Sequence, residues 1–274
     1  MTKNHLHLGL AGLFSTLFCN PLLAQKLPQV QQESLRATAQ FKTDGKATEI
    51  NNQFKAYNRN TDVYYTMAND DNNLYLILQA KDVVAAKKII GGGITLTINT
   101  TGKKNDVETV SVTFPKLPLG VKSTLGLLIT EPETATDAAG KKKQADSIAT
   151  VMNFALSVNA KEIKVKGVKA LADTLLSVYN MDGIKTVIKF DDKRALTYEI
   201  ALPLKYVTPD NKANKLYYQI KLNGLITETV YIKNPRPNGP VSVTTIPRSL
   251  NNGMATYELM NYPTDFWGEY TLIK

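Results

Sequence analysis

Apolar and polar residues alternate with a period of two along much of this 274-residue chain. Successive side chains of a β-strand point to opposite faces, so this alternation is typical of strands with one buried face. Turn dipeptides suited to hairpins lie between such stretches. The sequence therefore predicts a mainly all-β protein, an antiparallel β-sandwich. The alternating stretches are 74–79, 94–99, 110–114, 196–202 and 216–222, and the dipeptides are Asp44-Gly45, Thr101-Gly102, Asp182-Gly183, Asn223-Gly224, Asn238-Gly239 and Asn252-Gly253.

The segment from about 118 to 171 departs from this pattern. Apolar residues there have helical spacing behind Asp146 and Ser147, either of which is a good helix cap. Alternation returns at 162–169. We therefore expect a mixed insertion with a short helix, within one β-sandwich domain that covers residues 40–274. The helically spaced residues are Ile148, Val151, Met152, Ala155 and Leu156.

Residues 1–24 predict a secretory signal peptide. A basic residue precedes an apolar stretch at 8–18, and Ala24 offers a small residue for cleavage before Gln25. Cys19 raises a lipoprotein alternative, but the residue before it is too large for the lipidation motif. Residues 25–39 are expected to form a short arm or first strand. We expect a secreted protein, periplasmic, extracellular or cell-surface associated, without a transmembrane segment.

The histidines and the cysteine lie within the predicted signal peptide. His5, His7 and Cys19 are the only residues of these types. A chain that begins at Gln25 therefore lacks the side chains for serine–histidine or cysteine–histidine catalysis, thiolate redox chemistry, structural zinc and histidine-held haem. It also has no disulfide.

Carboxylates are the remaining candidates for catalysis, because pairs of them hydrolyse glycosidic bonds. Glu131, Glu133, Glu199 and Glu258 are available, but their spacing does not place two of them around one bond. Glu199 lies within an alternating strand, where a structural role is favoured. Nucleotide, metalloprotease and hydrolase motifs are not found. We expect that the protein is not an enzyme.

The charge balance is basic. The whole chain carries a net charge of +9, and loss of Lys3 with the signal peptide leaves 33 − 1 = 32 basic and 24 acidic residues, a net charge of +8. The short clusters at 103–104 and 141–143 follow glycines and are expected at loop tips. They lack an accompanying aromatic surface, which argues against nucleic acid as a partner. An anionic polysaccharide or membrane surface stays open.

Five stretches occur in an order that resembles the family 9-like carbohydrate-binding modules, which have a DOMON-like, immunoglobulin-like β-sandwich. The resemblance implies a protein that binds polysaccharide or oligosaccharide without cleaving it. Relatives that grip sugar ends use two tryptophans, whereas this chain has only Trp267, and Ile50 stands where many relatives have tryptophan. The stretches are FKTDGKATE (41–49), ANDDNNLYLILQAKD (68–82), GGITLTINTTGKK (92–104), TYEIALPL (197–204) and DFWGEYTL (265–272).

Aromatic residues are the candidates for sugar binding, because sugar C–H faces stack on rings. Trp267 has the widest ring, but a terminal aromatic also suits a last strand whose ring seals the sandwich, and we favour the seal. Tyr57, Tyr64 and Tyr65 lie close together near a predicted loop and are further candidates.

Three other tyrosines are placed by the strand pattern. Tyr198 falls on an apolar face and is expected in the core. Tyr75 and Tyr217 point opposite to their leucine neighbours and are expected to be exposed.

Asp70 and Asp71 precede the strand at 74–79. They are potential Ca²⁺ ligands, but no EF-hand glycine or distal glutamate follows, and Asn and Asp are common turn residues. We favour a corner that leads into the strand, and we expect no cofactor, with Ca²⁺ as the alternative.

Two alternatives to glycan binding remain. One is a structural or adhesion protein of the cell surface without glycan affinity, which predicts self-association or capture of a partner. The other is a haem-binding redox domain of the DOMON type, for which only methionine or unusual ligands are present.

Overall fold

The computed structural model describes residues 26–38, 41–99, 101, 109–171, 174–208, 214–225, 230–232, 241–243 and 260–274. The predicted signal peptide with Ala24, the cleavage partner Gln25 and Cys19 lie outside these residues. So do Glu258, the lysine pair at 103–104 and the turn dipeptides at 238–239 and 252–253.

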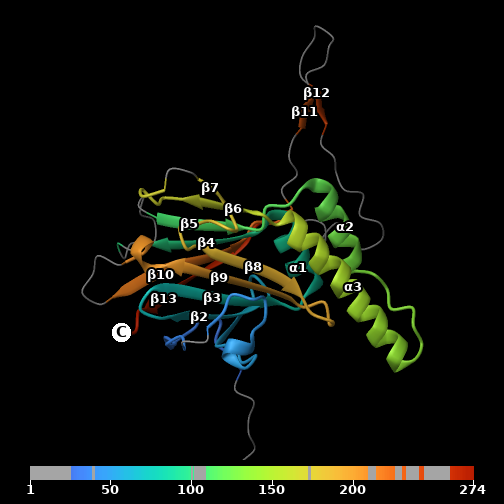
Figure 1. Ribbon diagram of the computed structural model, residues 1–274, viewed down its shortest axis with the longest axis horizontal. Helices are drawn as coiled ribbons and strands as arrows, with labels where there is room; N and C mark the ends of the chain where they lie inside the picture. The colour runs from blue at the N-terminus through green and yellow to red at the C-terminus, as the bar shows by residue number, and fades with distance from the viewer. Residues whose placement is uncertain are drawn as a thin grey trace, which may run out of the picture.

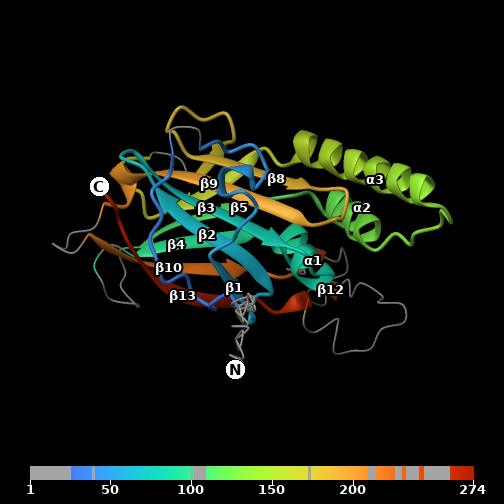
Figure 2. The same ribbon diagram turned by 90° about the horizontal axis from the view of Figure 1, so that it is seen from below.

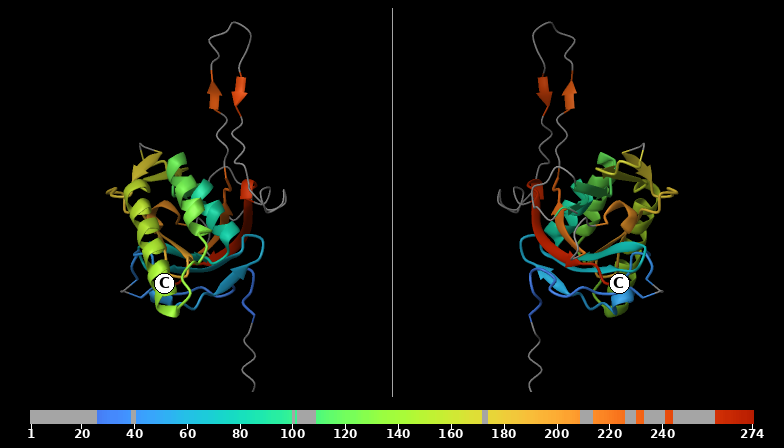
Figure 3. Two further views of the ribbon diagram at one scale, coloured as in Figure 1. Left: turned by 90° about the vertical axis from the view of Figure 1, so that its right-hand side faces the viewer. Right: turned by 90° about the vertical axis from the view of Figure 1, so that its left-hand side faces the viewer.

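Two antiparallel sheets stack as the layers of a sandwich (Figures 1 and 3). The predicted mainly all-β antiparallel fold is therefore confirmed. The five-stranded sheet has the order β1 (Ala56–Asn58), β2 (Val63–Asn69), β3 (Asn73–Ala80), β9 (Leu196–Pro203) and β8 (Lys185–Phe190). The six-stranded sheet has the order β13 (Thr264–Thr271), β10 (Lys215–Leu222), β4 (Ile94–Asn99), β5 (Thr109–Phe114), β6 (Glu162–Lys166) and β7 (Leu175–Ser177). β11 (Val230–Ile232) and β12 (Val241–Val243) pair only with each other.

The alternating pattern determines which side chains fill the core. Along β10, the apolar members of the pattern are buried and the polar members between them are half-exposed. β9 differs, because all eight of its residues are buried. Its outward side chains lie beneath the segment that opens the domain, which includes the 3₁₀ helix η1 (Thr48–Ile50). A polar residue at an outward position of β9 is therefore enclosed.

Three α-helices gather at one end of the sandwich (Figures 1 and 2). They are α1 (Val83–Gly92), α2 (Leu119–Ile129) and α3 (Ala138–Asn159), and a second 3₁₀ helix, η2 (Leu204–Tyr206), follows β9. α3 contains the predicted helical positions, but it is 22 residues long and is capped by Asp137, so the expectation of a short helix capped near residue 146 is wrong. β6, at the end of the expected insertion, pairs with β5 in the six-stranded sheet.

The N-terminal arm, residues 28–37, spans the open side between β2 and β13. The side-chain amide of Gln31 pairs with the backbone of Met67, donating to its carbonyl at 2.9 Å and accepting from its N–H at 2.7 Å. On the other sheet, the Tyr270 hydroxyl donates to the Leu35 carbonyl at 3.0 Å, and Arg36 donates to the Ile273 carbonyl at 2.9 Å. The arm thus fastens the edges of the two sheets together.

Candidate functional site

Trp267 lies on the outer face of the six-stranded sheet. Phe266 and Tyr270 point into the sandwich and are 6% and 3% exposed. Trp267 lies between these positions and points outward, where its side chain is half-buried. Gly268 faces inward, and glycine fits there because a Cβ would collide with the ring of Tyr218. The expectation that Trp267 seals the sandwich is therefore wrong, since its neighbours in sequence do so.

The predicted sugar-binding aromatics do not converge on one site. The rings of Tyr65 and Phe266 contact each other across the interior at 5.0 Å between centroids. Because side chains alternate along a strand, Tyr64 and Trp267 point out of opposite faces of the sandwich. Tyr65 is fully buried, and its hydroxyl lies 2.9 Å from that of Tyr218. Tyr65 is thus a core residue and is removed from the candidates.

Tyr57 and Tyr64 form a separate aromatic pair on the outer side of the five-stranded sheet. Their ring centroids are 4.6 Å apart, and the Lys81 ammonium lies 4.4 Å from the centroid of Tyr64. The Tyr57 hydroxyl donates to Asp62, and this hydrogen bond, with burial, raises the pKa of Tyr57 to about 12. Both rings are half-buried and already contact protein groups, so they present little free face.

A shallow hollow lies beside Trp267, between the arm and β13. Its volume is about 350 Å³. A second hollow of about 190 Å³ continues along the same groove and shares Gln31, Gln32 and Glu269 with the first. The first is lined by Val30, Gln31, Gln32, Trp267, Gly268 and Glu269. The groove therefore combines an aromatic ring with amide and carboxylate groups.

A polar row runs from this hollow across the six-stranded sheet. Strand pairing places Gln219 beside Trp267, followed by Thr97, Ser111 and Lys166 on successive strands. Four strand spacings of about 4.8 Å make this row about 19 Å long. The three middle side chains are half-exposed. Among the described residues, the hydroxyls of Thr97 and Ser111 have no protein hydrogen-bond partner, so they remain free for a ligand.

Tyr217 adds a second aromatic ring to this face. It pairs with Glu269, two residues along β13 from Trp267, so the two rings are diagonal neighbours on one face. Diagonal neighbours lie about 7 Å apart, within reach of aromatic side chains. Tyr217 is half-exposed, in agreement with the sequence-based expectation.

The charge of this face differs between its two edges. At the β13 edge, Lys215 and Glu269 form an ion pair at 2.8 Å, and this hydrogen bond raises the pKa of Lys215. Toward the other edge, on β6 beside the edge strand β7, Lys164 and Lys166 are exposed. The end of the row furthest from Trp267 is therefore basic.

The alternating pattern predicted the exposure of Tyr198 correctly but not that of Tyr75. Tyr75 is only 8% exposed, because Phe41 of the opening segment covers it with ring centroids 4.7 Å apart, so the expected exposure is wrong. Tyr198 is fully buried, as predicted, and burial raises the pKa of its hydroxyl.

The aspartates before β3 form a corner. Asp70 accepts the backbone N–H groups of Asn72 and Asn73 at 2.7 Å each, and the Tyr75 hydroxyl donates to it at 2.7 Å. Burial acts to raise the pKa of Asp70, but these hydrogen bonds outweigh it and the pKa is lowered. Asp71 is exposed and pairs with Arg36 at 2.6 Å. Both side chains thus have the structural roles that the turn interpretation favours.

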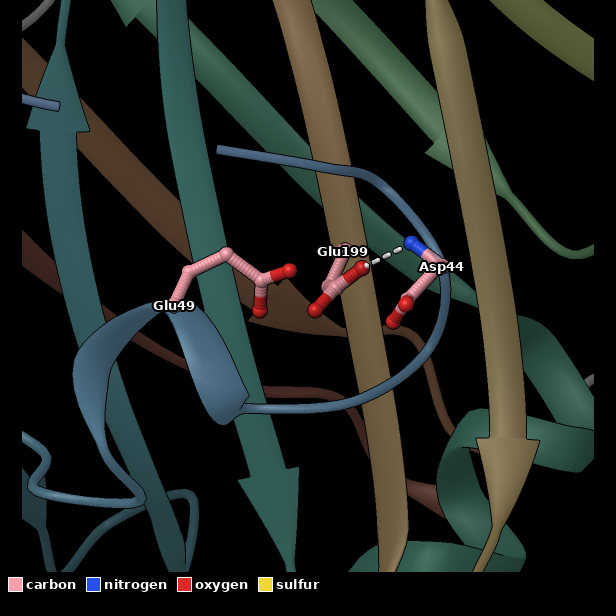
Figure 4. Close-up of side chains that lie close together, drawn as sticks. All are labelled: Asp44, Glu49 and Glu199. Atoms are coloured by element: carbon pink, nitrogen blue, oxygen red, sulfur yellow. Dashed lines mark hydrogen bonds between the residues drawn. The ribbon is translucent and has the colours of Figure 1, made fainter. Parts of the chain in front are cut away.

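Glu199 lies within a cluster of three carboxylates (Figure 4). It is 2% exposed, beneath the turn that contains Asp44 and Gly45, whose N–H groups donate to its Oε2 at 2.8 and 2.9 Å. Oxygen atoms of Asp44, Glu49 and Glu199 lie within 4.8 Å of one another. Burial, together with the charges of Glu49 and Asp44, raises the pKa of Glu199 to about 7, although the two hydrogen bonds act to lower it.

The sequence did not predict that Asp44, Glu49 and Glu199 lie close together. Asp44 and Glu49 belong to the opening segment, whereas Glu199 belongs to β9. The other acidic candidates stay apart, since Glu131 and Glu133 are exposed in the loop between α2 and α3, where Glu133 pairs with Lys141 at 2.8 Å. The Asp-Gly turn was visible in the sequence, but its position over β9 was not.

The fold and the outer-face groove define a two-sheet antiparallel β-sandwich protein with a surface aromatic groove. Comparison of the chain with protein-family models, curated proteins and solved structures found no match. In the described part of the chain, every helix is too short or too polar to cross a bilayer.

Proposed function

We propose that this protein is a secreted, non-catalytic carbohydrate-binding module whose site is the groove beside Trp267 and the polar row across the six-stranded sheet. The observation that carries the proposal is the outward, half-exposed position of Trp267 beside the hollow. A ring in this position offers a flat surface to sugar C–H groups.

The neighbouring groups have the chemistry that sugar hydroxyls require. Gln32 and Glu269 line the hollow, and the hydroxyls of Thr97 and Ser111 follow along the row. Small-molecule sites combine apolar surface with a few polar groups that fix orientation. Tyr217 provides a second aromatic ring beside Trp267, in place of the second tryptophan that this chain lacks. The resemblance to family 9-like modules points to the same class of ligand.

The length and charge of the row favour an oligosaccharide with an anionic unit. A row of about 19 Å is longer than one sugar, so several units fit between Trp267 and the far edge. Lys164 and Lys166 at that edge are exposed and are positioned to meet a carboxylate or sulfate group. Such contacts are weakened by salt.

The position of Glu199 supports binding without cleavage. Its carboxyl group has the neighbours and the pKa of a general acid, but it is 2% exposed beneath the Asp44–Gly45 turn. A glycosidic bond must lie between two accessible carboxyl groups to be hydrolysed. The hollow that Trp267 lines, and the second hollow that continues from it, are on the other sheet.

A glycan array followed by titration of the retained glycans tests this proposal. Trp267 is the only tryptophan, so its fluorescence reports binding directly. We expect bound glycan to shift the emission, and Trp267→Ala to reduce the affinity at least tenfold while the protein stays folded. The matched control is Phe154→Ala, which removes an aromatic side chain that is 70% exposed on α3 and should leave binding unchanged.

Three results would contradict the proposal. Retention of glycan by Trp267→Ala at full affinity would place the site elsewhere. Release of free sugar that depends on Glu199 would show an enzyme. Absence of glycan binding with concentration-dependent self-association would favour the adhesion alternative, whereas a Soret band after addition of haem would favour the haem-binding alternative.

A further inference from the structure

We propose that Asp44, Glu49 and Glu199 form a binding site for Ca²⁺, which fastens the opening segment onto the five-stranded sheet. The site lies on the opposite sheet from Trp267 and is independent of glycan binding. It is separate from the corner at Asp70 and Asp71, where Asp71 is paired with Arg36. At the proposed site, the Asp44 Oδ1 also accepts the Lys46 N–H at 3.0 Å.

The three carboxylates converge from two distant segments. Glu49 comes from η1, Asp44 from the turn before it, and Glu199 from the middle of β9. In Figure 4 their carboxyl groups point toward one another. Among the described residues, none of the three forms a salt bridge with a lysine or arginine; Lys189 lies nearby but donates to the backbone carbonyl of Asp44 at 2.6 Å. Three acidic groups at this distance repel one another unless a cation or a proton intervenes.

The second oxygen of Glu199 provides independent support for a ligand. Oε2 accepts two backbone N–H groups, whereas Oε1 is buried and has no hydrogen-bond partner. Buried polar atoms are almost always satisfied, because an unpaired one costs its full desolvation energy. Glu199 is only 2% exposed, and in Figure 4 its oxygen that is not bonded to the Asp44 N–H points toward Glu49. A bound cation would satisfy this atom.

The ligand type favours Ca²⁺. Only carboxylate oxygens are offered, and hard cations prefer oxygen ligands. Ca²⁺ accepts about six to eight oxygen ligands in a flexible geometry, whereas Mg²⁺ requires a near-ideal octahedron and keeps several of its own waters. A group of three carboxylates within 4.8 Å of one another therefore suits Ca²⁺ better. Asp44 and Glu49 are half-exposed, which leaves room for water to complete the coordination.

Ca²⁺ would hold a specific part of the fold. Ala47, Ile50 and Phe54 of the opening segment pack on Ile77 of the five-stranded sheet, next to Glu199 on β9. A cation bound to both the segment and β9 stabilises the closed position of this apolar cluster.

Calorimetric titration of the chelator-treated full chain with CaCl2, together with thermal unfolding, tests the site. We expect a Kd of 10⁻³ M or tighter, on the order found in extracellular Ca²⁺ modules. At a hundredfold excess over Kd, the Tm should rise by about 5 to 10 °C. Glu199→Gln and Glu49→Gln should each weaken binding at least tenfold. Asp71→Asn, which removes an acid from the other corner, should leave it unchanged.

Glu49→Gln keeps the test decisive if Glu199→Gln fails to fold, because Glu49 is half-exposed and its hydrogen bond is to the neighbouring Thr48 hydroxyl at 3.3 Å. Absence of Ca²⁺ binding by the wild type would overturn the proposal. So would binding that survives in the folded Glu49→Gln variant, or a shift produced by MgCl2 but not by CaCl2. Loss of glycan binding in the Trp267 variant would not affect any of these results.

Discussion

Glu199→Gln should stabilise the cation-free protein at neutral and basic pH. The glutamine carbonyl can accept the same two N–H groups, from Asp44 and Gly45, that Oε2 accepts. Its NH₂ group can donate toward the carboxylates of Asp44 and Glu49, where Oε1 now has no partner. The substitution therefore keeps the shape of the side chain, removes a buried negative charge and satisfies an orphaned position.

The magnitude follows from the pKa of Glu199. Burial raises this pKa from its ordinary value of 4.5 to about 7, so the folded state holds a proton that the unfolded state has already lost in this window. The stability of the wild type therefore falls as the pH rises from about 4.5 to 7, and the loss is complete above 7. The difference between the two pKa values corresponds to about 3 kcal/mol. The variant lacks this loss, so its stability relative to the wild type should increase by about 3 kcal/mol across this range.

Urea unfolding of both proteins in chelator, at several pH values between 4.5 and 8, measures this difference. Ile77→Val provides the control, since Ile77 pairs with Glu199 across β3 and β9 and has no charge. Its cost of about 1 kcal/mol should be the same at every pH. A stability difference between wild type and Glu199→Gln that is flat across the range would refute the reasoning, because it would show that Glu199 ionises in the fold as it does in the unfolded chain.

Three other predictions concern the core, the groove and the corner. Phe266→Ala should cost about 3 to 5 kcal/mol in chemical unfolding, whereas Trp267→Ala should cost clearly less, because only Phe266 fills the interior; equal costs would return Trp267 to the core. Tyr65→Phe should cost about 1 to 2 kcal/mol, since it leaves the Tyr218 hydroxyl and a backbone N–H of the arm unpaired, and an unchanged unfolding midpoint would contradict this. Asp70→Ala should cost about 1 to 2 kcal/mol of unfolding free energy at neutral pH. Because the pKa of Asp70 is lowered in the fold, its contribution is present above pH 3.8 and is lost as the pH falls through the lowered value. An equal cost in strong acid would be inconsistent with this prediction.

The sequence predicted the strands and turns that are determined by neighbouring residues. The alternation along β10 and the polar corner at Asp70 correctly placed the strands and the turn, because period and turn chemistry are properties of neighbouring residues. α1 was not predicted. Its sequence, VVAAKKIIGG, contains β-branched pairs and is only ten residues long, and its cap, Asp82, follows directly after a strand.

The errors in predicted exposure concern contacts between distant segments. The burial of Tyr75 and Glu199 depends on the opening segment, which lies over the outer face of the five-stranded sheet. Alternation assigns outward positions to solvent unless another layer covers them, and nothing local in the strand reveals that cover. The sequence also did not determine which face of β13 carries Trp267. Phe266 and Tyr270 lie on one face and Trp267 on the other, so the strand is aromatic on both faces.

The N-terminal arm has a consequence for the order in which the chain folds. The hydrogen bonds that join it to β13 and the residues after it link positions 235 to 237 apart in the sequence. Contacts of such long separation form late, because the entropy of closing the loop must be overcome first. Until β13 is in place, β10 is the edge strand of the six-stranded sheet and a template for association between chains. β13 then becomes the edge strand, and the arm lies beside it. The step that closes the sandwich is therefore also the step that covers part of its exposed edge.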